Sequence, residues 1–198
     1  MSETPIQAAR FRPKARMAKI LGEQLIRDNT VGLMELIKNS YDADAVHVTV
    51  ELRGLGSREG TTIIVCDDGT GMTESDIRGP WFEPANASKE SQKTDGTRTV
   101  KGRLPLGEKG VGRFAAQKLG RKLELVTRPA GSGLEHVVRV DWDAYDDDTL
   151  YMDEVEVPIA ARPPEVFLGN EHGTCLIMRG AREPWRRDDL QRFQASLI

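Results

Sequence analysis

The residues best placed for chemistry stand in a glycine-rich stretch just past the middle of the 198-residue chain. The segment Leu106–Phe114 has glycines at 107, 110 and 112, and the residues over 115–120 favour a helix. Free backbone N–H groups and the dipole at a helix N-terminus attract anions. We therefore expect this segment to form an anion-binding site.

Two familiar phosphate-binding motifs do not fit this segment. Residues 110–115 match Gly-x-Gly-x-x-Ala, but the dinucleotide fingerprint follows directly on a strand, and residues 102–108 do not form one. The P-loop ends in Gly-Lys-Ser or Gly-Lys-Thr, which this segment lacks.

A second group of residues follows an apolar, β-rich run over 61–66 that is typical of a buried strand. The run ends in Asp67, with glycines at 69 and 71 and Met72 directly after them. Such a turn brings the backbone close to a ligand. The alternative is an ordinary Asp-Gly turn, which is common.

A third group lies on a helix that should begin after an N-cap within 28–30. Glu35, Asn39 and Asp42 stand at i, i+4 and i+7 and therefore share one face. A polar helix face is usually only solvated. Asn and Asp stabilise helix interiors poorly, which favours a functional use of this face.

Composition bounds the class of protein. The chain is 38% hydrophobic and 30% charged with a formal net charge of −3, as in a globular domain. The acidic balance argues against non-specific nucleic-acid binding by the whole domain. No run approaches the ~20 apolar residues of a membrane span. We expect Cys66 and Cys175 to be buried, reduced thiols in a cytoplasmic protein rather than a disulfide.

The remaining elements are predicted from hydrophobic periodicity and from the positions of residues that break helices and strands. We expect a leading helix over 14–26, a short helix over 73–78, and strands over 46–52, 61–66, 122–128, 135–142 and 174–179. Between the last two strands lies an acidic, proline-containing stretch, of which residues 141–148 are interpreted as solvated loop. Residues 1–13 are expected to be a flexible leader and residues 14–180 the domain, with a long loop over about 79–109 that is either a functional lid or a disordered insertion. Residues 181–198 are expected to be a linking helix toward a further domain, because the pattern stops midway.

Four motifs occur in a fixed order: Glu-x3-Asn-x2-Asp-Ala, Asp-x-Gly-x-Gly-Met, Gly-x2-Gly-x-Gly, and Gly173-Thr174. In this order they resemble the ATP-binding domain of the GHKL superfamily (gyrase, heat-shock chaperone, histidine kinase, MutL), over roughly residues 17–180. The resemblance implies an α+β fold of the Bergerat type. This is a two-layer α/β sandwich with a mixed, mostly antiparallel sheet, helices on one face, and an ATP lid.

The resemblance also implies roles for individual residues. Asn39 would coordinate Mg²⁺, and Glu35 would orient and deprotonate the attacking water. Asp67 would accept the adenine amino group with help from Thr174. The other residues implied to contact the nucleotide are Asp42, Ala43, Gly71, Met72, Lys109, Gly110, Val111, Gly112, Arg113 and Phe114.

Within the superfamily, Glu35 and the Gly-Val-Gly-Arg-Phe run favour the hydrolysing branch of chaperone, MutL and MORC-like proteins. Trp81 and the pair Ser88-Lys89 are most similar to the MORC-like group, while residues 79–81 depart from the chaperones and leave the ribose and lid contacts open. The expected activity is slow, Mg-dependent ATP hydrolysis that drives conformational change or dimerisation in a larger protein. Two alternatives remain: a histidine-kinase-type catalytic domain, and an ATP-gated scaffold with little turnover.

Overall fold

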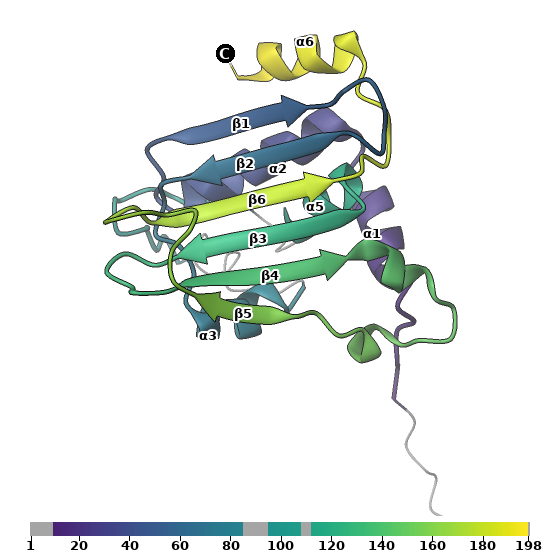
Figure 1. Ribbon diagram of the computed structural model, residues 1–198, viewed down its shortest axis with the longest axis horizontal. Coiled ribbons are helices and arrows are strands. Elements are labelled where there is room, and N and C mark those ends of the chain that lie inside the picture. The colour runs from purple at the N-terminus through teal and green to yellow at the C-terminus, as the bar shows by residue number, and fades with distance from the viewer. Residues whose placement is uncertain (1–9, 85–94, 108–111, 198) are drawn as a thin grey trace, which may run out of the picture.

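A computed structural model describes residues 10–84, 95–107 and 112–197, and for Arg113 only the backbone. Six strands form one sheet in the order β1-β2-β6-β3-β4-β5, and every pairing is antiparallel (Figure 1). The strands are β1 Val48–Arg53, β2 Thr62–Asp67, β3 Lys122–Arg128, β4 Glu135–Asp141, β5 Ile159–Arg162 and β6 Gly173–Arg179. The α+β fold is confirmed, although the described sheet is wholly antiparallel rather than mixed.

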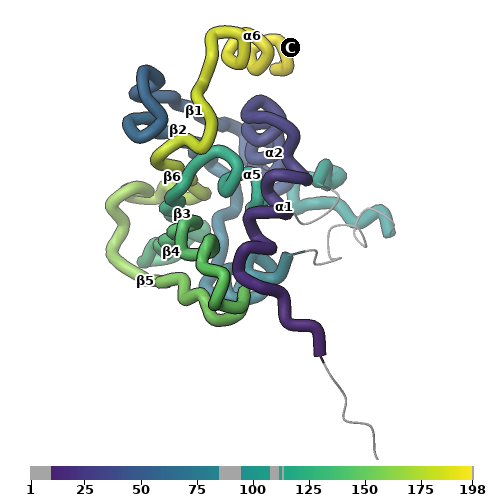
Figure 2. The backbone as a smooth tube through the Cα atoms, turned by 90° about the vertical axis from the view of Figure 1, so that its right-hand side faces the viewer, coloured from purple at the N-terminus to yellow at the C-terminus, as the bar shows by residue number. Residues whose placement is uncertain are grey.

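Three helices cover one face of the sheet (Figures 1 and 2): α1 Met17–Leu25, α2 Asn29–Asp42 and α5 Gly112–Leu119. A fourth helix, α6 Arg187–Ser196, packs against α2 beyond the β1 edge. The shorter pieces are α3 Glu74–Asp76, the π-helix η1 Ile77–Trp81, and the 3₁₀ turns η2 Trp142–Asp146 and η3 Met152–Glu154. In the described ranges, no helix combines the length and apolar character that a membrane crossing requires.

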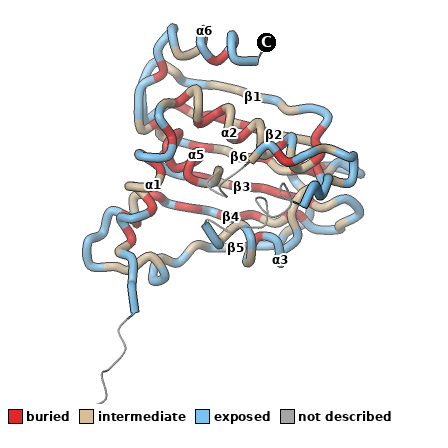
Figure 3. The backbone as a smooth tube through the Cα atoms, turned by 180° about the vertical axis from the view of Figure 1, so that it is seen from behind, coloured by how far each residue is buried: buried red, intermediate tan, exposed pale blue. Residues whose placement is uncertain are grey.

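The main core lies between the sheet and the helices. Side chains alternate between the two faces of a strand, so Ile63 and Val65 of β2 point to the helix layer. Leu33 and Leu36 of α2 meet them there, and Figure 3 shows this inner layer as the buried part of the chain. The sheet therefore holds α2 rigidly beside the end of β2.

The boundaries of α2 have clear local causes. The Asp28 side chain accepts from Val31 N at 3.0 Å, which confirms the expected N-cap. Asp44, just beyond the helix, takes a positive φ of 62° that ends the helical path.

The leading helix is shorter than expected and buries small residues. Apolar residues recur in this stretch at Met17, Ile20, Leu21 and Leu25, but Met17 and Leu25 are exposed, whereas Ala18 and Gly22 are buried. The reason is close packing on α5: a Cβ added at Gly22 would lie 1.9 Å from Gln117 Oε1. Small residues permit this approach of α1 to α5.

The stretch between β4 and β6 contains elements that were not predicted from the sequence. It contains β5, which pairs with β4, and the η2 and η3 turns. Pro158 and Pro163 flank β5, and prolines are tolerated at sheet edges, so they did not exclude a strand there.

Part of the expected leader is described and lies along the acidic stretch that follows β4. Arg12 contacts Glu154 at 3.1 Å, and Arg16 contacts Asp148 at 3.2 Å. The Lys14 backbone forms an antiparallel bridge with Tyr151. Opposite charges therefore hold residues 12–16 against the domain.

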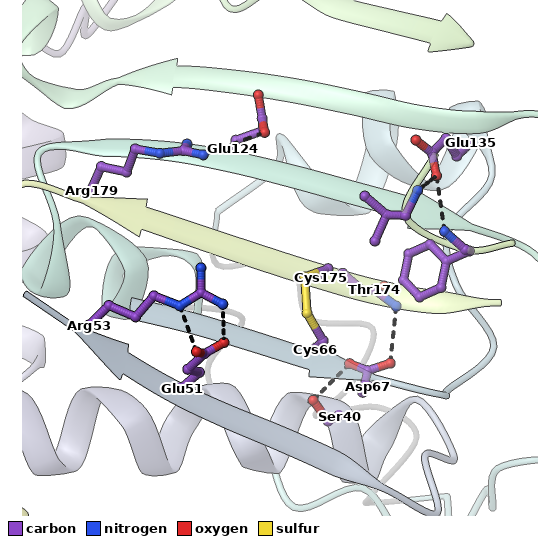
Figure 4. The surroundings of a disulfide bond; sticks show 12 residues. Ser40, Glu51, Arg53, Cys66, Asp67, Glu124, Glu135, Thr174, Cys175 and Arg179 are labelled. Atoms are coloured by element: carbon purple, nitrogen blue, oxygen red, sulfur yellow. Dashed lines mark hydrogen bonds and ion pairs between the residues drawn. A yellow bond between two sulfur atoms is a disulfide. The ribbon is translucent and has the colours of Figure 1, made fainter. Parts of the chain in front are cut away.

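The expectation of two reduced thiols is wrong, because the structure joins Cys66 and Cys175 in a disulfide (Figure 4). Cys66 of β2 stands directly opposite Cys175 of β6, with Cα atoms 4.0 Å apart. The antiparallel register brings together two residues that are 109 positions apart in sequence. Both lie with Val126, Val137 and Phe167 in a small apolar cluster separate from the main core.

Candidate functional site

A cavity of about 360 Å³ lies where α2, the sheet and the start of α5 meet. Its volume falls within the range of small-molecule sites, about 300–1,000 Å³. Eight of the residues singled out from the sequence line it: Asn39, Asp42, Ala43, Asp67, Gly71, Met72, Gly112 and Thr174. Motifs far apart in the sequence therefore converge on one site.

Asp67 is the anchor of one end of the cavity. Its Oδ2 accepts from Ser40 Oγ at 2.8 Å, and its Oδ1 accepts from Thr174 N at 3.2 Å (Figure 4). The Oδ1 atom also accepts from Gly69 N at 2.9 Å. Burial raises the pKa of the Asp67 carboxyl above its ordinary value, although these hydrogen bonds oppose the rise. Three hydrogen bonds thus fix this half-buried acceptor.

Thr127 organises the same end and was missed from the sequence. The sheet register places Asp67, Thr174 and Thr127 in one row across β2, β6 and β3. The fully buried Thr127 hydroxyl accepts from Met72 N at 2.9 Å and lies 2.9 Å from Thr174 Oγ1. Ser40 was also missed. A Ser in a helix and a Thr in a strand carry no distinguishing signal until the register is known.

The Asp-x-Gly-x-Gly turn is held between α2 and β3. Thr70 N donates to Ala43 O at 2.8 Å, and this hydrogen bond attaches the turn to the C-terminal end of α2. Gly71 has a φ of +68°, and a Cβ at this position would lie 2.2 Å from Arg128 O. Only glycine fits there, as the sequence motif indicated.

Asn39 and Gly112 meet at the opposite end of the cavity. A Cβ added at Gly112 would lie 2.2 Å from Asn39 Nδ2, so the start of α5 lies directly against this amide. Lys109, Gly110 and Val111 lie outside the described residues, as does the Arg113 side chain. Phe114 is packed in the main core, 2% exposed, and does not line the cavity.

Glu35 lies one helical turn before Asn39 on α2 but is not among the residues that line the cavity. Its carboxylate forms an ion pair with Lys38 Nζ at 2.7 Å. The structure therefore places Glu35 next to the site and directs its carboxylate to a neighbouring cation.

Two further segments contact the site, one through the lining residue Asp42 and the other by lining the cavity itself. The Asp42 carboxylate accepts from Leu106 N at 2.7 Å and from Gly107 N at 3.1 Å, which ties α2 to the start of the glycine-rich segment. Pro80 and Trp81 line the cavity from η1. The remaining lid residues named above, Ser88 and Lys89, lie outside the described residues.

The donor set suits a metal that arrives with a phosphate ligand. In the described ranges, no group of three or more His, Cys, Asp or Glu side chains could hold a metal by itself. The oxygen of the Asn39 amide is a ligand of the kind Mg²⁺ uses, and Mg²⁺ commonly combines one or two protein ligands with water and substrate phosphates. The residues present therefore fit Mg²⁺ bound together with a nucleotide.

Comparison with known proteins agrees with this geometry. The chain is 26% identical over 168 residues to a "Putative type II restriction enzyme HgiDII" of Herpetosiphon aurantiacus, an alignment that covers 80% of this chain and 25% of that protein. The chain thus spans about a quarter of that relative's length. Residues 28–174, most of the chain, match the family described as "Histidine kinase-, DNA gyrase B-, and HSP90-like ATPase". The chain belongs to this family of GHKL-type ATP-binding domains.

Proposed function

We propose that this domain binds ATP with Mg²⁺ in the cavity between Asp67 and Gly112 and hydrolyses it slowly. One observation carries the proposal. A half-buried carboxylate, held by three hydrogen bonds, stands at one end of a cavity of about 360 Å³, and a glycine-started helix stands against Asn39 at the other. The first end suits a base that donates a hydrogen bond. The second suits phosphates.

Adenine selectivity follows from the acceptor at Asp67. An adenine amino group donates, whereas guanine presents a carbonyl at the corresponding position and would leave two acceptors facing each other. A site built around such a hydrogen bond can discriminate by ~10⁴ or more. Met72, whose N–H is fixed by Thr127, is positioned to pack against the base.

At the phosphate end, the proposed roles divide among α2 and α5. Asn39 supplies an oxygen ligand to Mg²⁺, and the residues over 109–114 supply backbone N–H groups to the phosphates. When bound, Mg²⁺ neutralises the charge on the phosphate oxygens. Glu35 is the proposed general base for the attacking water. In that role its carboxylate turns from Lys38 toward the cavity.

Calorimetry and a γ-labelled ATP assay test the proposal together. ATP should bind and GTP should not, and free phosphate should be released. Glu35→Gln should keep ATP binding and lose turnover by ~10²–10⁴, whereas Glu23→Gln, an exposed change on α1, should alter neither. Equal affinity for ATP and GTP would refute the adenine site. Phosphate transferred to a partner histidine favours the kinase alternative, and tight binding without release favours the scaffold.

A second proposal concerns the assembly of the whole protein. We propose that ATP binding drives self-association of the whole protein, to be measured by sedimentation with a non-hydrolysable ATP analogue. Because the relative from Herpetosiphon aurantiacus is named as a putative restriction enzyme, action on DNA is the hypothesis for the whole protein. Double-stranded DNA should then stimulate phosphate release by the full-length protein, and an unchanged rate would count against it.

A further inference from the structure

The segment 99–107 wraps the C-terminal end of α2, and Asp44 is its central contact. Asp44 is only 3% exposed, and its carboxylate accepts from Thr99 Oγ1 at 2.5 Å and from Lys101 N at 3.0 Å. Lys101 Nζ returns a hydrogen bond to Asp44 O at 2.8 Å. One buried residue after the helix thus holds both the side chain of Thr99 and the backbone of Lys101.

Arg103 completes the attachment by capping the end of α2. Its guanidinium donates to Tyr41 O at 3.2 Å and to Ala45 O at 2.7 Å, and it lies 4.6 Å from the centre of the Tyr41 ring. Tyr41 O also accepts from Asp44 N, and Ala45 lies just beyond the helix, so Arg103 adds a cation at the C-terminal end of α2, where the helix dipole favours positive charge. Arg103 Nε also lies 4.0 Å from Asp44 Oδ1.

Asp44 has a backbone conformation that is unusual for a residue with a side chain. Asp44 has a φ of 62°, and no other non-glycine residue in the described ranges has a positive φ. Glycine is the default residue for this conformation, and aspartate is tolerated. Burial raises the pKa of the Asp44 carboxyl, but the bonds from Thr99 and Lys101 and the charge of Arg103 outweigh it, so the pKa lies below its ordinary value. The group is therefore ionised at neutral pH and matched to its cationic neighbours.

The attached segment leads directly into the proposed phosphate loop. Leu106 N and Gly107 N donate to the Asp42 carboxylate at 2.7 and 3.1 Å, and α5 begins at Gly112 beside Asn39. The same helix, α2, thus fixes the chain on both sides of residues 108–111. A change in the contact at Asp44 alters where this chain enters the loop.

We propose that Asp44 is a positioning residue for the phosphate end of the site. It docks residues 99–107 onto α2 and so sets the entry to the glycine-rich loop, although it does not line the cavity. The inference rests on the proposed function, because it assumes that the loop binds phosphates. In this proposal Asp44 affects the phosphate end of the site, whereas Asp67 acts at the adenine end.

Three variants isolate the contact. Asp44→Gly removes the carboxylate and keeps a residue that accepts the positive φ. Thr99→Val removes the partner hydroxyl with little change of shape, and it tests the contact even where Asp44→Gly fails to fold. Thr97→Val is the matched control, because Thr97 is exposed and lies two residues before the attached segment.

Trypsin reports the docking without any nucleotide. Arg98, Lys101 and Arg103 are cleavage sites inside or next to the attached segment. Asp44→Gly and Thr99→Val should be cut there about tenfold faster than the wild type, as expected for the loss of a buried hydrogen bond to a charged group. Thr97→Val should be cut at the wild-type rate. Equal cleavage of all four proteins would overturn the docking.

Calorimetry then reports the effect on the site. ATP should bind Asp44→Gly and Thr99→Val about tenfold more weakly, whereas adenosine, which has no phosphates, should bind within about twofold of the wild type. Equal losses for ATP and adenosine would show a merely structural role and overturn the inference, as would unchanged ATP affinity. A wild-type protein that binds no ATP refutes the proposed function itself, and the docking then stands or falls on the trypsin result.

Discussion

Asp67 and Thr174 stand opposite each other on β2 and β6, and the Thr174 N–H donates to the Asp67 carboxylate at 3.2 Å. The next strand, β3, adds Thr127 to the same row. A three-strand row therefore fixes the acceptor, its donor and a hydroxyl before any ligand arrives. Such preorganisation reduces the ordering that binding would otherwise require.

Asp67→Asn should abolish ATP binding and at the same time raise the thermal midpoint at neutral pH. The Asn side chain keeps an oxygen for Gly69 and Thr174, but it presents an NH₂ group to the proposed adenine amino group. Because burial raises the pKa of Asp67, its ionised form costs folding free energy above that pKa. The cost disappears as the pH falls through the raised pKa toward the ordinary 3.8 and the carboxyl becomes protonated.

Melting curves across this pH range and calorimetry at neutral pH check the prediction. The difference in midpoint should shrink in acid, and the exposed Asp188→Asn change should leave both binding and midpoint as in the wild type. A variant that still binds ATP with wild-type affinity would remove Asp67 from the site.

Thr127→Val should weaken ATP binding, because it leaves Met72 N without its acceptor and removes the partner of the Thr174 hydroxyl. Leaving a buried polar group unpaired costs about 1–3 kcal/mol, so the affinity should fall by about 5-fold to 150-fold if the whole cost appears in binding. Thr127→Ser keeps the hydroxyl and should restore most of the affinity. If Ser and Val behave alike, the hydroxyl is not what positions the base.

The Asp67 and Gly112 ends of the site could be anticipated from the sequence, whereas their supports could not. An aspartate after a strand, a glycine pair and a glycine-rich helix start are local signals, and the structure brings all three to one cavity. Ser40 and Thr127 are ordinary residues whose role comes only from the register of α2 against β2 and of β3 against β6. That register depends on segments far apart in the chain, so the local sequence around each residue does not reveal it.

Three features of the structure were not predicted from the sequence: the disulfide, the strand β5 and the buried face of α1. The two cysteines were expected to stay reduced because compartment and spacing suggested no pairing, yet β2 and β6 place them at opposed positions. The strand β5 was missed because prolines flank it and it is only four residues long. The pattern of large apolar residues does not identify the buried face of α1, because the small residues Ala18 and Gly22 are buried and Gly22 packs closely on α5.

Gly112→Ala should separate the two ends of the nucleotide. The added Cβ would meet Asn39 Nδ2 at 2.2 Å, so either the amide or the start of α5 must move. Mg-ATP binding should fall sharply, while adenosine binding at the Asp67 end should change little. Gly133→Ala is the matched control, since a Cβ there meets nothing within 4 Å. Calorimetry with both ligands decides the matter, and unchanged Mg-ATP affinity in Gly112→Ala would contradict the proposed phosphate end.

Reduction of the Cys66–Cys175 disulfide should lower the free energy of unfolding by about 2–4 kcal/mol, the usual contribution of a bond that closes a long loop. The two residues are 109 positions apart, so the unfolded chain gains much freedom when the bond is broken. The bond joins β2 and β6 one residue away from Asp67 and Thr174, so ATP affinity should be measured in the same samples. Urea unfolding with and without a thiol reductant gives the stability difference, and the double variant Cys66→Ser, Cys175→Ser should not respond to the reductant. Identical midpoints for the oxidised and reduced wild type would show that the sulfurs are not bonded in solution, and the two strands would then be held by their register alone.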